Sequence, residues 1–394
     1  MEYQHGGDIY TQEIETDYSA NINPLGLPEG VRDMLAASIG TEVCSVYPDS
    51  RCTRLREALG RHHGVPEEWI ICGNGAADLI FGLVYAEKPE RALVTAPAFS
   101  EYEQALNVCG CRISHLVLQE KDGFAVDMDQ LLHMLTDAYR EGKPYDMVFL
   151  CNPNNPTGIP ITAQDMQRAA KACLETGTLL VADECFCDFM EKPEACSVIP
   201  LLGENGNLFV LKAFTKLYSM AGLRLGYGLC SNGELLERLN RVRQPWSVSG
   251  LAQKAGEAAL GETEYVKQTR ALIGTEREWL RRELEALGFT VYDSRANYLF
   301  FRVFDGEGRQ KPDREGSAQH SDAATGQKGW LYHRLLARRV LIRSCGNYPG
   351  LDASYYRICV KTRAENQQLM EHMKAAVREQ QEALEETDGW QRQL

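Results

Sequence analysis

A lysine with a hydroxyl beside it and an arginine eight residues further on is the arrangement in this chain best suited to chemistry. Lys216 follows an apolar, strand-like run, Thr215 precedes it directly, and Arg224 lies beyond a glycine-containing turn. A lysine in a partly buried pocket has a lowered pKa, and its amine can then condense with an aldehyde. Hydroxyl and guanidinium groups bind phosphate. The three residues fit an aldehyde that carries a phosphate, although lysines and arginines beside a glycine turn are more often solvated surface charges.

Two further strand-like runs end in polar residues that suit the same ligand. Asp183 follows the run 178–182, and a carboxylate there can pair with a protonated ring nitrogen, which makes a pyridine an electron sink. A structural ion pair would explain Asp183 equally well. Asn155 follows the run 147–151 in a stiff loop of two prolines and three asparagines, and its amide can donate to a phenolate oxygen.

A glycine turn and an aromatic residue follow two more runs. Gly75 and Ala76 lie between the run 69–72 and a helical pattern, where backbone N–H groups and the helix dipole attract phosphate. A plain tight turn is the simpler explanation. Phe99 follows the run 91–95 and can stack on a flat ring, although such a residue is more often part of a core. Because ligands of α/β sheets bind beyond the carboxyl ends of strands, the five signals together predict one ligand, pyridoxal 5'-phosphate.

The elements that must position these residues predict an α/β fold, with a mostly parallel sheet flanked by helices. The strand candidates are 91–97, 146–151, 178–182, 208–211 and 225–230. Amphipathic stretches alternate with them from about residue 50 to 250. The helix between the second and third candidates has Thr162 at its N-cap, Asp165 at the capping-box spacing and Gly177 after its end.

The same pattern divides the chain into three predicted parts. Residues 1–40 form an N-terminal arm that packs with the small domain, and 41–250 form the large cofactor-binding domain. Residues 251–394 form a smaller α+β domain. Within it, 305–329 is polar and rich in Gly, Asp and Gln, which predicts a mobile surface insertion.

The composition of this 394-residue chain argues against several classes of binding partner. Its formal net charge is -13, and it has no long basic run, so nucleic acid and anionic membranes are not expected partners. No apolar run approaches membrane-spanning length, and no signal peptide opens the chain, so we expect a cytoplasmic protein. The thirteen cysteines include no C-x-x-C pair, so we expect no metal site and reduced thiols that serve as small core residues.

Taken together, the motifs resemble the fold type I pyridoxal phosphate enzymes, in the class I/II aminotransferase branch with aspartate and histidinol-phosphate aminotransferases. The resemblance runs from about residue 18 to 375. Its hallmarks are Asn-Pro-Thr-Gly at 155–158, Asp-Glu at 183–184, Thr-Lys at 215–216 and Ala-Gly-Leu-Arg-Leu-Gly-Tyr at 221–227. It implies the family's fold, a large domain with a mostly parallel sheet and a smaller C-terminal domain.

The resemblance also implies a role for each matching residue. Lys216 is implied to bind the cofactor aldehyde and to move the substrate proton, and Asp183 to pair with the ring nitrogen. Asn155 is implied to donate to the phenolic oxygen, and Phe99 to stack on the ring. The implied phosphate ligands are Thr215, Arg224 and the backbone at Gly75 and Ala76.

Two more matches concern the subunit partner and the substrate. Tyr47 resembles the tyrosine that reaches the cofactor phosphate of a neighbouring subunit, which implies a homodimer. Arg357 resembles the arginine that binds the substrate α-carboxylate as a bidentate pair. The implied substrate is a small amino acid or a phosphorylated amine.

Three stretches, 5–8, 19–26 and 341–351, resemble the threonine-phosphate decarboxylase group of the family. This implies decarboxylation of L-threonine O-3-phosphate to (R)-1-amino-2-propanol phosphate, as in cobalamin biosynthesis. The candidate ligands of the substrate phosphate and carboxylate are His5, Asn23 and Arg343, although His5 could instead serve only to dock the N-terminal arm.

Two other functions stay open at the level of sequence. An aminotransferase that acts on histidinol phosphate or another amino acid would use the same residues, because the sequence does not reveal which bond to Cα breaks. A regulator or scaffold that binds the cofactor without turnover is the third possibility. Such proteins usually carry a DNA-binding module, and this chain has no extra basic domain.

Overall fold

The computed structural model describes residues 6–303 and 329–391, with side chains up to residue 385. These residues form two compact units. The large unit comprises Ile22–Gly274 and Ser294–Asn297, and the small unit comprises the described residues up to Asn21, Thr275–Asp293 and those from Tyr298 onward. Apart from Gly329, the insertion predicted at 305–329 lies outside the described residues. The predicted domain boundary at residue 250 stays a prediction.

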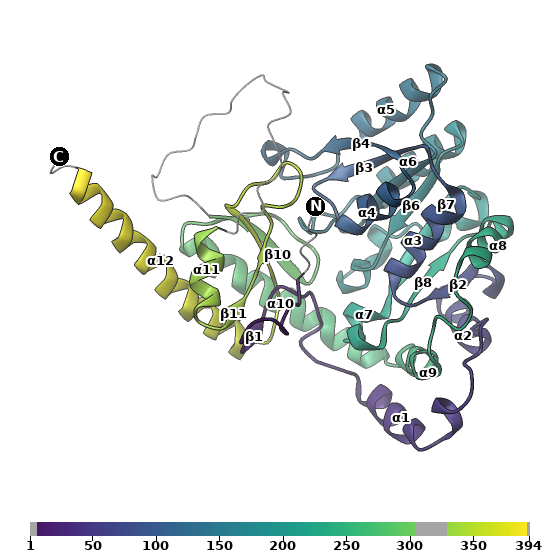
Figure 1. Ribbon diagram of the computed structural model, residues 1–394, viewed down its shortest axis with the longest axis horizontal. Helices are drawn as coiled ribbons and strands as arrows, with labels where there is room; N and C mark the ends of the chain where they lie inside the picture. The colour runs from purple at the N-terminus through teal and green to yellow at the C-terminus, as the bar shows by residue number, and fades with distance from the viewer. Residues whose placement is uncertain (1–5, 304–328, 392–394) are drawn as a thin grey trace. The chain divides into compact units, whose positions relative to one another are not determined.

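A seven-stranded sheet forms the centre of the large unit (Figure 1). Its strands are β2 (Ile70–Gly73), β3 (Arg91–Ala96), β4 (Arg112–Val117), β5 (Met147–Cys151), β6 (Leu179–Asp183), β7 (Leu208–Ala213) and β8 (Gly226–Leu229). Their order is β2-β8-β7-β6-β5-β3-β4, and β8 alone runs antiparallel to its neighbours β7 and β2. The predicted mostly parallel α/β fold is therefore confirmed.

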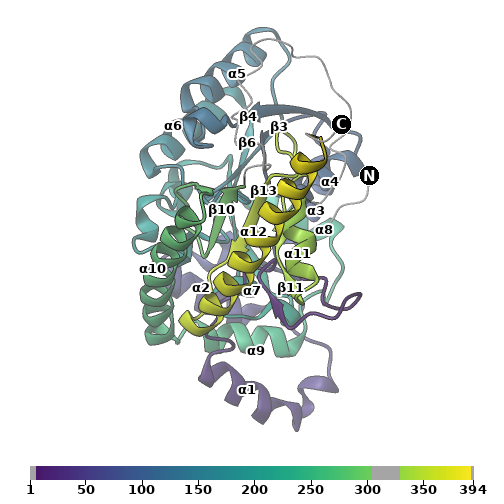
Figure 2. The same cartoon turned by 90° about the vertical axis from the view of Figure 1, so that its left-hand side faces the viewer.

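Helices cover both faces of this sheet. Alternate residues of the central strands pack against α3, α4 and α8 on one face, and α5 and α6 lie together on the other (Figure 2). The helices are α1 (Glu29–Ile39), α2 (Thr53–His63), α3 (Ala76–Glu87), α4 (Ser100–Val108), α5 (Met128–Arg140), α6 (Ala163–Thr176), α7 (Phe214–Leu217), α8 (Gly233–Val242) and α9 (Gly250–Ala259). Because both faces are covered, β5 and β6 are buried at every position rather than at alternate ones.

The predicted caps of α6 are present. The Thr162 hydroxyl accepts from the backbone N–H of Asp165, and it donates to the Asp165 carboxylate at 2.9 Å. Gly177 ends the helix in the left-handed conformation, with φ of 70°. The side chain of a β-branched residue would be strained there, whereas glycine adopts this conformation without penalty. The cap signals in the sequence therefore placed this helix correctly.

The small unit is built on a four-stranded sheet of order β12-β13-β10-β9, whose pairings are all antiparallel. Its strands are β9 (Thr290–Val291), β10 (Tyr298–Arg302), β12 (Arg343–Ser344) and β13 (Tyr355–Cys359). The N-terminal strand β1 (Thr16–Asp17) pairs in parallel with β11 (Val340–Leu341). The helices are α11 (Trp330–Leu336) and α12 (Arg363–Gln391), and the end of α10 (Thr263–Ala286) also belongs to this unit.

None of the described helices has a stretch long and apolar enough to cross a membrane. All thirteen cysteines are free thiols, and most of them are buried, with Cys44 exposed. Among the described residues, no group of three or more His, Cys, Asp or Glu side chains is arranged to hold a metal ion.

Candidate active site

The segment that carries Lys216 is held in place by Asn23. Strand β7 ends at Ala213, and Lys216 lies half-buried on the short helix α7. The backbone N–H of Asn23 donates to the Lys216 carbonyl at 3.2 Å, and its side-chain amide donates to the Leu217 carbonyl and the Thr269 hydroxyl, both at 2.7 Å. Asn23 therefore positions the lysine segment. Its predicted contact with substrate stays a prediction.

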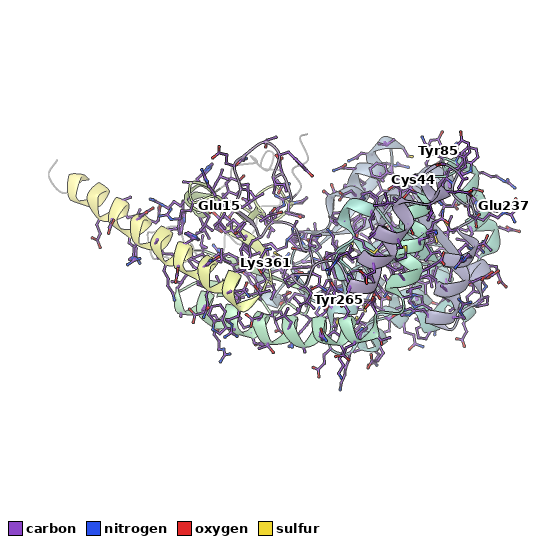
Figure 3. The ribbon with its side chains drawn as sticks, turned by 90° about the horizontal axis from the view of Figure 1, so that it is seen from below. Glu15, Cys44, Tyr85, Glu237, Tyr265 and Lys361 are labelled. Atoms are coloured by element: carbon purple, nitrogen blue, oxygen red, sulfur yellow. The ribbon has the colours of Figure 1, made fainter. Side chains whose placement is uncertain are left out.

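The chain after Asn23 is fixed to a helix of the same unit. The hydroxyl of Tyr265, on the first part of α10, donates to the Gly26 carbonyl at 2.6 Å (Figure 3). The Ser219 hydroxyl donates to the Asn23 carbonyl at 2.8 Å. Lys216 and the residues that follow it, Leu217 and Ser219, are thus hydrogen-bonded to the N-terminal stretch, which limits the freedom of the lysine.

Asp183 is the last residue of β6, and a tyrosine orients its buried carboxylate. The Tyr102 hydroxyl donates to Asp183 Oδ2 at 2.5 Å, and the backbone N–H of Cys185 donates to Oδ1 at 3.0 Å. Burial raises the pKa of Tyr102, so its hydroxyl keeps its proton and acts as a donor. A carboxylate held in this way is suited to a protonated ring nitrogen. Sequence reasoning missed Tyr102, because it lies one helical turn beyond Phe99 on α4 with no motif of its own.

Gly75 and Arg224 come together to form a cradle at the start of α3. Gly75 has φ of 80°, and a Cβ built on it would lie 2.5 Å from Arg224 Nη2. A Cβ on Gly226 would lie 2.5 Å from the backbone nitrogen of Ala76. Both close approaches require glycine. The Arg224 guanidinium therefore lies close to the N–H groups at the N-terminus of the twelve-residue helix α3. These are the groups that bind phosphate in proteins. Thr215 is buried on α7.

The structure separates the three asparagines of the 152–155 loop. The Asn152 amide donates to the carbonyls of Ile161 and Cys196, both at 3.0 Å. The Asn154 amide donates to the Pro97 carbonyl at 3.1 Å and to the Thr157 hydroxyl at 3.0 Å. These two side chains therefore hold the loop together. Asn155 is buried directly after them, and it is the candidate donor to a phenolate oxygen.

Glu101 is a second residue that sequence reasoning missed. It is the second residue of α4, and burial raises the pKa of its carboxyl to about 7, with Lys216 opposing that rise and Asp183 adding to it. Raised pKa values of this kind are concentrated at functional sites. Glu101 thus places a carboxyl that titrates near neutral pH within electrostatic range of both Lys216 and Asp183.

A buried ion network lies beside this site. The Lys212 amine is 3.0 Å from the Asp188 carboxylate and 3.6 Å from that of Glu184. The Glu184 carboxylate also accepts from the Ser197 hydroxyl at 2.8 Å and from the Val198 backbone at 2.7 Å. Burial alone would lower the pKa of Lys212, but the two carboxylates raise it well above its ordinary value. Lys212 is therefore a permanent charge that holds the chain after Asp183.

In the small unit, two buried arginines face each other across a pair of strands. Arg343 of β12 and Arg357 of β13 are direct partners in the antiparallel register. Directly opposed residues have their side chains on the same face of a sheet, and two like charges there repel each other. Arg343 donates to Asn347 at 2.9 Å, and Arg357 donates to the Ser19 carbonyl at 2.6 Å. Such a pair is suited to a ligand with two anionic groups.

The residues that follow His5 lie against Ser19, although His5 itself is outside the described residues. The Gly7 backbone N–H donates to the Ser19 hydroxyl at 2.7 Å. A Cβ on Gly6 would lie 2.3 Å from the Ser19 carbonyl oxygen, the same oxygen that accepts from Arg357. The two glycines thus allow the N-terminal stretch to approach the Arg357 side of the small unit.

The two aromatic candidates differ in exposure. Phe99 is partly buried, and its ring meets Tyr102 edge to face with ring centroids 5.6 Å apart. Tyr47 is 79% exposed and stacks on Trp246 with centroids 4.6 Å apart. Because Tyr102 contacts both Phe99 and Asp183, Phe99 lies near the strand end that carries Asp183. Tyr47, in contrast, projects from a surface loop of the large unit.

The residues of the large unit fit pyridoxal phosphate. The cradle at Gly75 suits the phosphate, the oriented carboxylate of Asp183 suits the pyridine nitrogen, and the amine of Lys216 suits the aldehyde. Asn155 adds a buried amide for the phenolic oxygen. All of these groups follow the ends of strands in one sheet, as expected for the ligand of an α/β fold.

Comparison with known proteins identifies the family. The profile described as "Aminotransferase class I and II" matches residues 15–373. The chain therefore belongs to the class I and II aminotransferase family, and it is an enzyme whose cofactor is pyridoxal 5'-phosphate. The resemblance inferred from the motifs is confirmed.

Individual relatives cover nearly the whole chain. The chain is 38% identical to threonine-phosphate decarboxylase of Salmonella typhimurium, over 93% of this chain and 94% of that protein. It is 34% identical to histidinol-phosphate aminotransferase of Symbiobacterium thermophilum, over 91% and 90%. Among solved structures, the histidinol-phosphate aminotransferase of Clostridium acetobutylicum matches with a TM-score of 0.80 and 26% identity, covering 92% of this chain and 99% of that one.

Proposed function

We propose that this enzyme decarboxylates L-threonine O-3-phosphate to (R)-1-amino-2-propanol phosphate, as in cobalamin biosynthesis. The observation that carries the proposal is the opposed pair of Arg343 and Arg357. Threonine phosphate has one carboxylate and one phosphate, so it offers an anionic group to each guanidinium. The relative from Salmonella typhimurium, which carries the name of this activity, supports the same assignment.

Within the large unit, each residue has a task that its surroundings support. When bound, pyridoxal phosphate supplies an electron sink for the electron pair left at Cα. Asp183 holds a proton on the ring nitrogen, and Tyr102 keeps that carboxylate in position. Lys216 would hold the aldehyde of the cofactor, and its amine would carry the proton to and from Cα of the substrate. Thr215, Arg224 and the N–H groups at Gly75 and Ala76 hold the phosphate, while Phe99 and Asn155 contact the ring.

In the small unit, Arg357 binds the carboxylate and Arg343 the phosphate of the substrate. The carbonyl of Ser19 already accepts from Arg357, which fixes the direction of that guanidinium. His5 is proposed as a further phosphate ligand, on the strength of the two glycines that follow it.

The decisive experiment compares two reactions of the purified holoenzyme. Threonine phosphate labelled in its carboxyl group is supplied without any keto acid, and the release of labelled CO₂ is measured. In parallel, histidinol phosphate is supplied with 2-oxoglutarate, and formation of glutamate is measured. We expect CO₂ in the first reaction and little glutamate in the second. Brisk glutamate formation with no CO₂ would reject the decarboxylase assignment.

The two arginines can be tested separately. We expect Arg357→Ala to weaken binding of carboxylate-bearing ligands by about 2–5 kcal/mol, because a buried charge pair is lost. We expect Arg343→Ala to weaken binding of phosphate-bearing ligands instead. Dissociation constants of threonine, threonine phosphate and 1-amino-2-propanol phosphate, read from the cofactor absorbance, distinguish the two. Equal losses for all three ligands in both variants would contradict the assigned roles.

A second candidate function is transamination of histidinol phosphate or another amino acid. The specific observation in its favour is the 34% identity to a histidinol-phosphate aminotransferase over most of both chains. The residues assigned above serve either reaction, since both begin with the same amine and the same cofactor. The parallel assays therefore decide between them.

We also propose that the enzyme is a homodimer in which Tyr47 reaches the cofactor phosphate of the neighbouring subunit. The support is the high exposure of Tyr47 and its placement on a Trp246 ring that is itself 48% exposed. Two exposed aromatic rings stacked on each other form an apolar surface that favours contact with a partner. Sedimentation equilibrium of the purified holoenzyme tests this proposal, and a monomer at micromolar concentration would reject it.

A further inference from the structure

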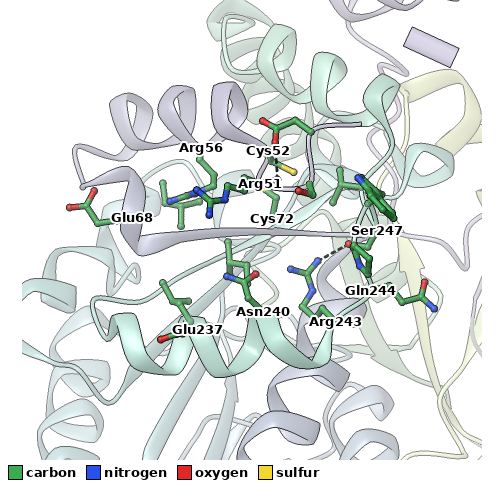
Figure 4. A pocket seen from close by; sticks show the side chains of 18 residues that line it. Arg51, Cys52, Arg56, Glu68, Cys72, Glu237, Asn240, Arg243, Gln244 and Ser247 are labelled. Atoms are coloured by element: carbon green, nitrogen blue, oxygen red, sulfur yellow. Dashed lines mark hydrogen bonds between the residues drawn. The ribbon is translucent and has the colours of Figure 1, made fainter. Parts of the chain in front are cut away.

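A pocket of about 580 Å³ opens in the large unit between the start of α2, strand β2 and the end of α8 (Figure 4). None of the proposed cofactor ligands lines it. Its walls include two cysteines, Cys52 and Cys72, and three arginines, Arg51, Arg56 and Arg243. The assigned activity uses none of these residues.

The two cysteines are neighbours in space although they are far apart along the chain. Cys52 is the N-cap residue of α2, in the left-handed conformation with φ of 50°, and Cys72 lies in β2. The two thiols interact, and each shifts the pKa of the other. Both residues line the pocket while remaining 4% and 5% exposed, and Figure 4 shows their side chains together on one wall.

The surroundings of Cys52 favour its thiolate. The interaction with Cys72 lowers the pKa of the Cys52 thiol most, and Arg243 and Arg56 lower it further, against the effects of burial and Asp49. A cysteine at a helix N-terminus gains additional stabilisation of its negative charge from the helix dipole. The same interaction, together with burial, raises the pKa of the Cys72 thiol. The pair thus combines one thiol with a lowered pKa and one with a raised pKa.

Arg243 adds a fixed positive charge to the pocket. Its side chain is 8% exposed, and Nη2 donates to Asp78 and to Ser247 at 2.8 and 2.9 Å. Its Nε is buried and, within the described part of the chain, has no hydrogen-bond partner. Asp78 in turn accepts from the backbone N–H of Asn74, in the turn that leads to Gly75. The pocket is therefore connected to the proposed phosphate cradle through one ion pair.

We propose that Cys52 and Cys72 are a modification site, a dithiol that hydroperoxides convert reversibly to a disulfide. The Cys52 thiolate attacks one oxygen of hydrogen peroxide, the O–O bond breaks, and a sulfenic acid and hydroxide result. The Cys72 sulfur then attacks the Cys52 sulfur, the S–O bond breaks, and the Cys72 proton leaves with the hydroxide as water. Two thiols and one peroxide give one disulfide and two waters. The disulfide joins the start of α2 to the strand that precedes Gly75.

A second close pair in the same unit provides the internal comparison. The sulfurs of Cys187 and Cys196 are 3.0 Å apart. Neither of them lines this pocket, and both are almost completely buried. The hydrogen bond to Cys196, with burial, raises the pKa of the Cys187 thiol, so its thiolate is rare. If proximity alone decided reactivity, Cys187 and Cys196 would oxidise first.

The test is peptide mapping of the wild-type holoenzyme after brief treatment with hydrogen peroxide. Remaining thiols are alkylated, and the protein is digested without reduction. We expect a peptide linked through Cys52 and Cys72 to form first, and dithiothreitol to reverse it. Formation of the Cys187–Cys196 link first, or oxidation of other thiols with no Cys52–Cys72 link, would overturn the proposal.

Two variants assign the order of events. With Cys72→Ser, we expect Cys52 to stop at the sulfenic acid, which dimedone traps as a stable adduct. With Cys52→Ser, we expect Cys72 to react with peroxide at least tenfold more slowly than Cys52 does in the wild type. The matched control is Cys187→Ser, which we expect to leave the Cys52–Cys72 link unchanged. Equal dimedone labelling of Cys52 and Cys72 in the two variants would contradict the assigned roles.

Discussion

Two lysines four residues apart lie in contrasting surroundings. Lys212, in β7, is buried against the carboxylates of Asp188 and Glu184, and these raise its pKa. Lys216, on α7, is half-buried, and the nearby carboxyl of Glu101 has a pKa of about 7. Lys212 therefore stays a charged ammonium ion. Beside Lys216, in contrast, the charge of Glu101 changes near neutral pH.

The difference teaches that burial alone does not make a lysine reactive. Desolvation favours the neutral amine, but an ionised carboxylate at 3.0 Å outweighs it in the case of Lys212. Lys212 therefore stabilises the chain between Asp183 and Val198, while Lys216 is the lysine that we propose for the chemistry. Substitutions at the two positions should separate these two roles.

Replacement of Lys216, the proposed catalytic lysine, is expected to have the largest effect. Lys216→Ala should reduce turnover by at least about 10³-fold, because both the nucleophile and the proton carrier are lost. The cofactor absorbance band of the lysine adduct should also disappear, while the free energy of unfolding stays close to that of the wild type. The exposed Lys171→Ala on α6 is the matched control and should retain activity. Borohydride treatment and peptide mapping provide the direct check, and a pyridoxyl tag on any residue except 216 would refute the assignment.

Replacement of the structural lysine should do the reverse. Lys212→Met leaves two carboxylates buried without their cation, which should lower the free energy of unfolding by about 3–5 kcal/mol. The further change Asp188→Asn should restore part of the loss, because the stranded charge at 3.0 Å is removed. Urea unfolding of the three proteins measures both effects. If Lys212→Met lost turnover while it kept its stability, the division of roles between the two lysines would be wrong.

The contrast between these lysines also marks what the sequence can predict. The residues at the strand ends, Lys216 and Asp183 among them, stand in local motifs, so their types and spacing predicted the cofactor and the fold. The caps of α6 were equally local, with Thr162 three residues before its partner Asp165. Such features depend on neighbours within a few positions of the chain, and the structure confirms the α/β fold built from them.

Features that depend on distant contacts were not predictable. Tyr102 reaches Asp183 across 81 positions, and Lys212 reaches Asp188 across 24. The three asparagines of the 152–155 loop look alike in sequence, and only the carbonyls that they meet distinguish the structural ones. The opposition of Arg343 and Arg357 likewise follows from a strand register rather than from a motif.

A substitution at Tyr102 tests whether its hydroxyl positions the carboxylate of Asp183. Tyr102→Phe removes a buried hydroxyl that donates to Asp183 at 2.5 Å, a charge-assisted bond worth about 1.5–3 kcal/mol. We expect turnover to fall by roughly tenfold for each 1.4 kcal/mol that reaches the transition state. Because Tyr102 is a positioning residue, the informative measurement is the pH titration of the cofactor absorbance, which a merely structural role would leave unchanged. A shifted titration midpoint supports the role, and an unshifted one with lowered stability contradicts it.

The last prediction concerns Glu101 and is a dependence of the free energy of unfolding on pH. Burial raises the pKa of this carboxyl from its ordinary value of 4.5 to about 7 in the folded protein. Between these two values the folded state retains a proton that the unfolded state has lost, so the free energy of unfolding falls as pH rises from 4.5 to 7. Glu101→Gln cannot lose that proton. We therefore expect the wild type, free of cofactor, to lose more stability over this range than the variant. Urea unfolding at several pH values measures the difference, and parallel stability curves for the two proteins would show that Glu101 is not the titrating group beside Lys216.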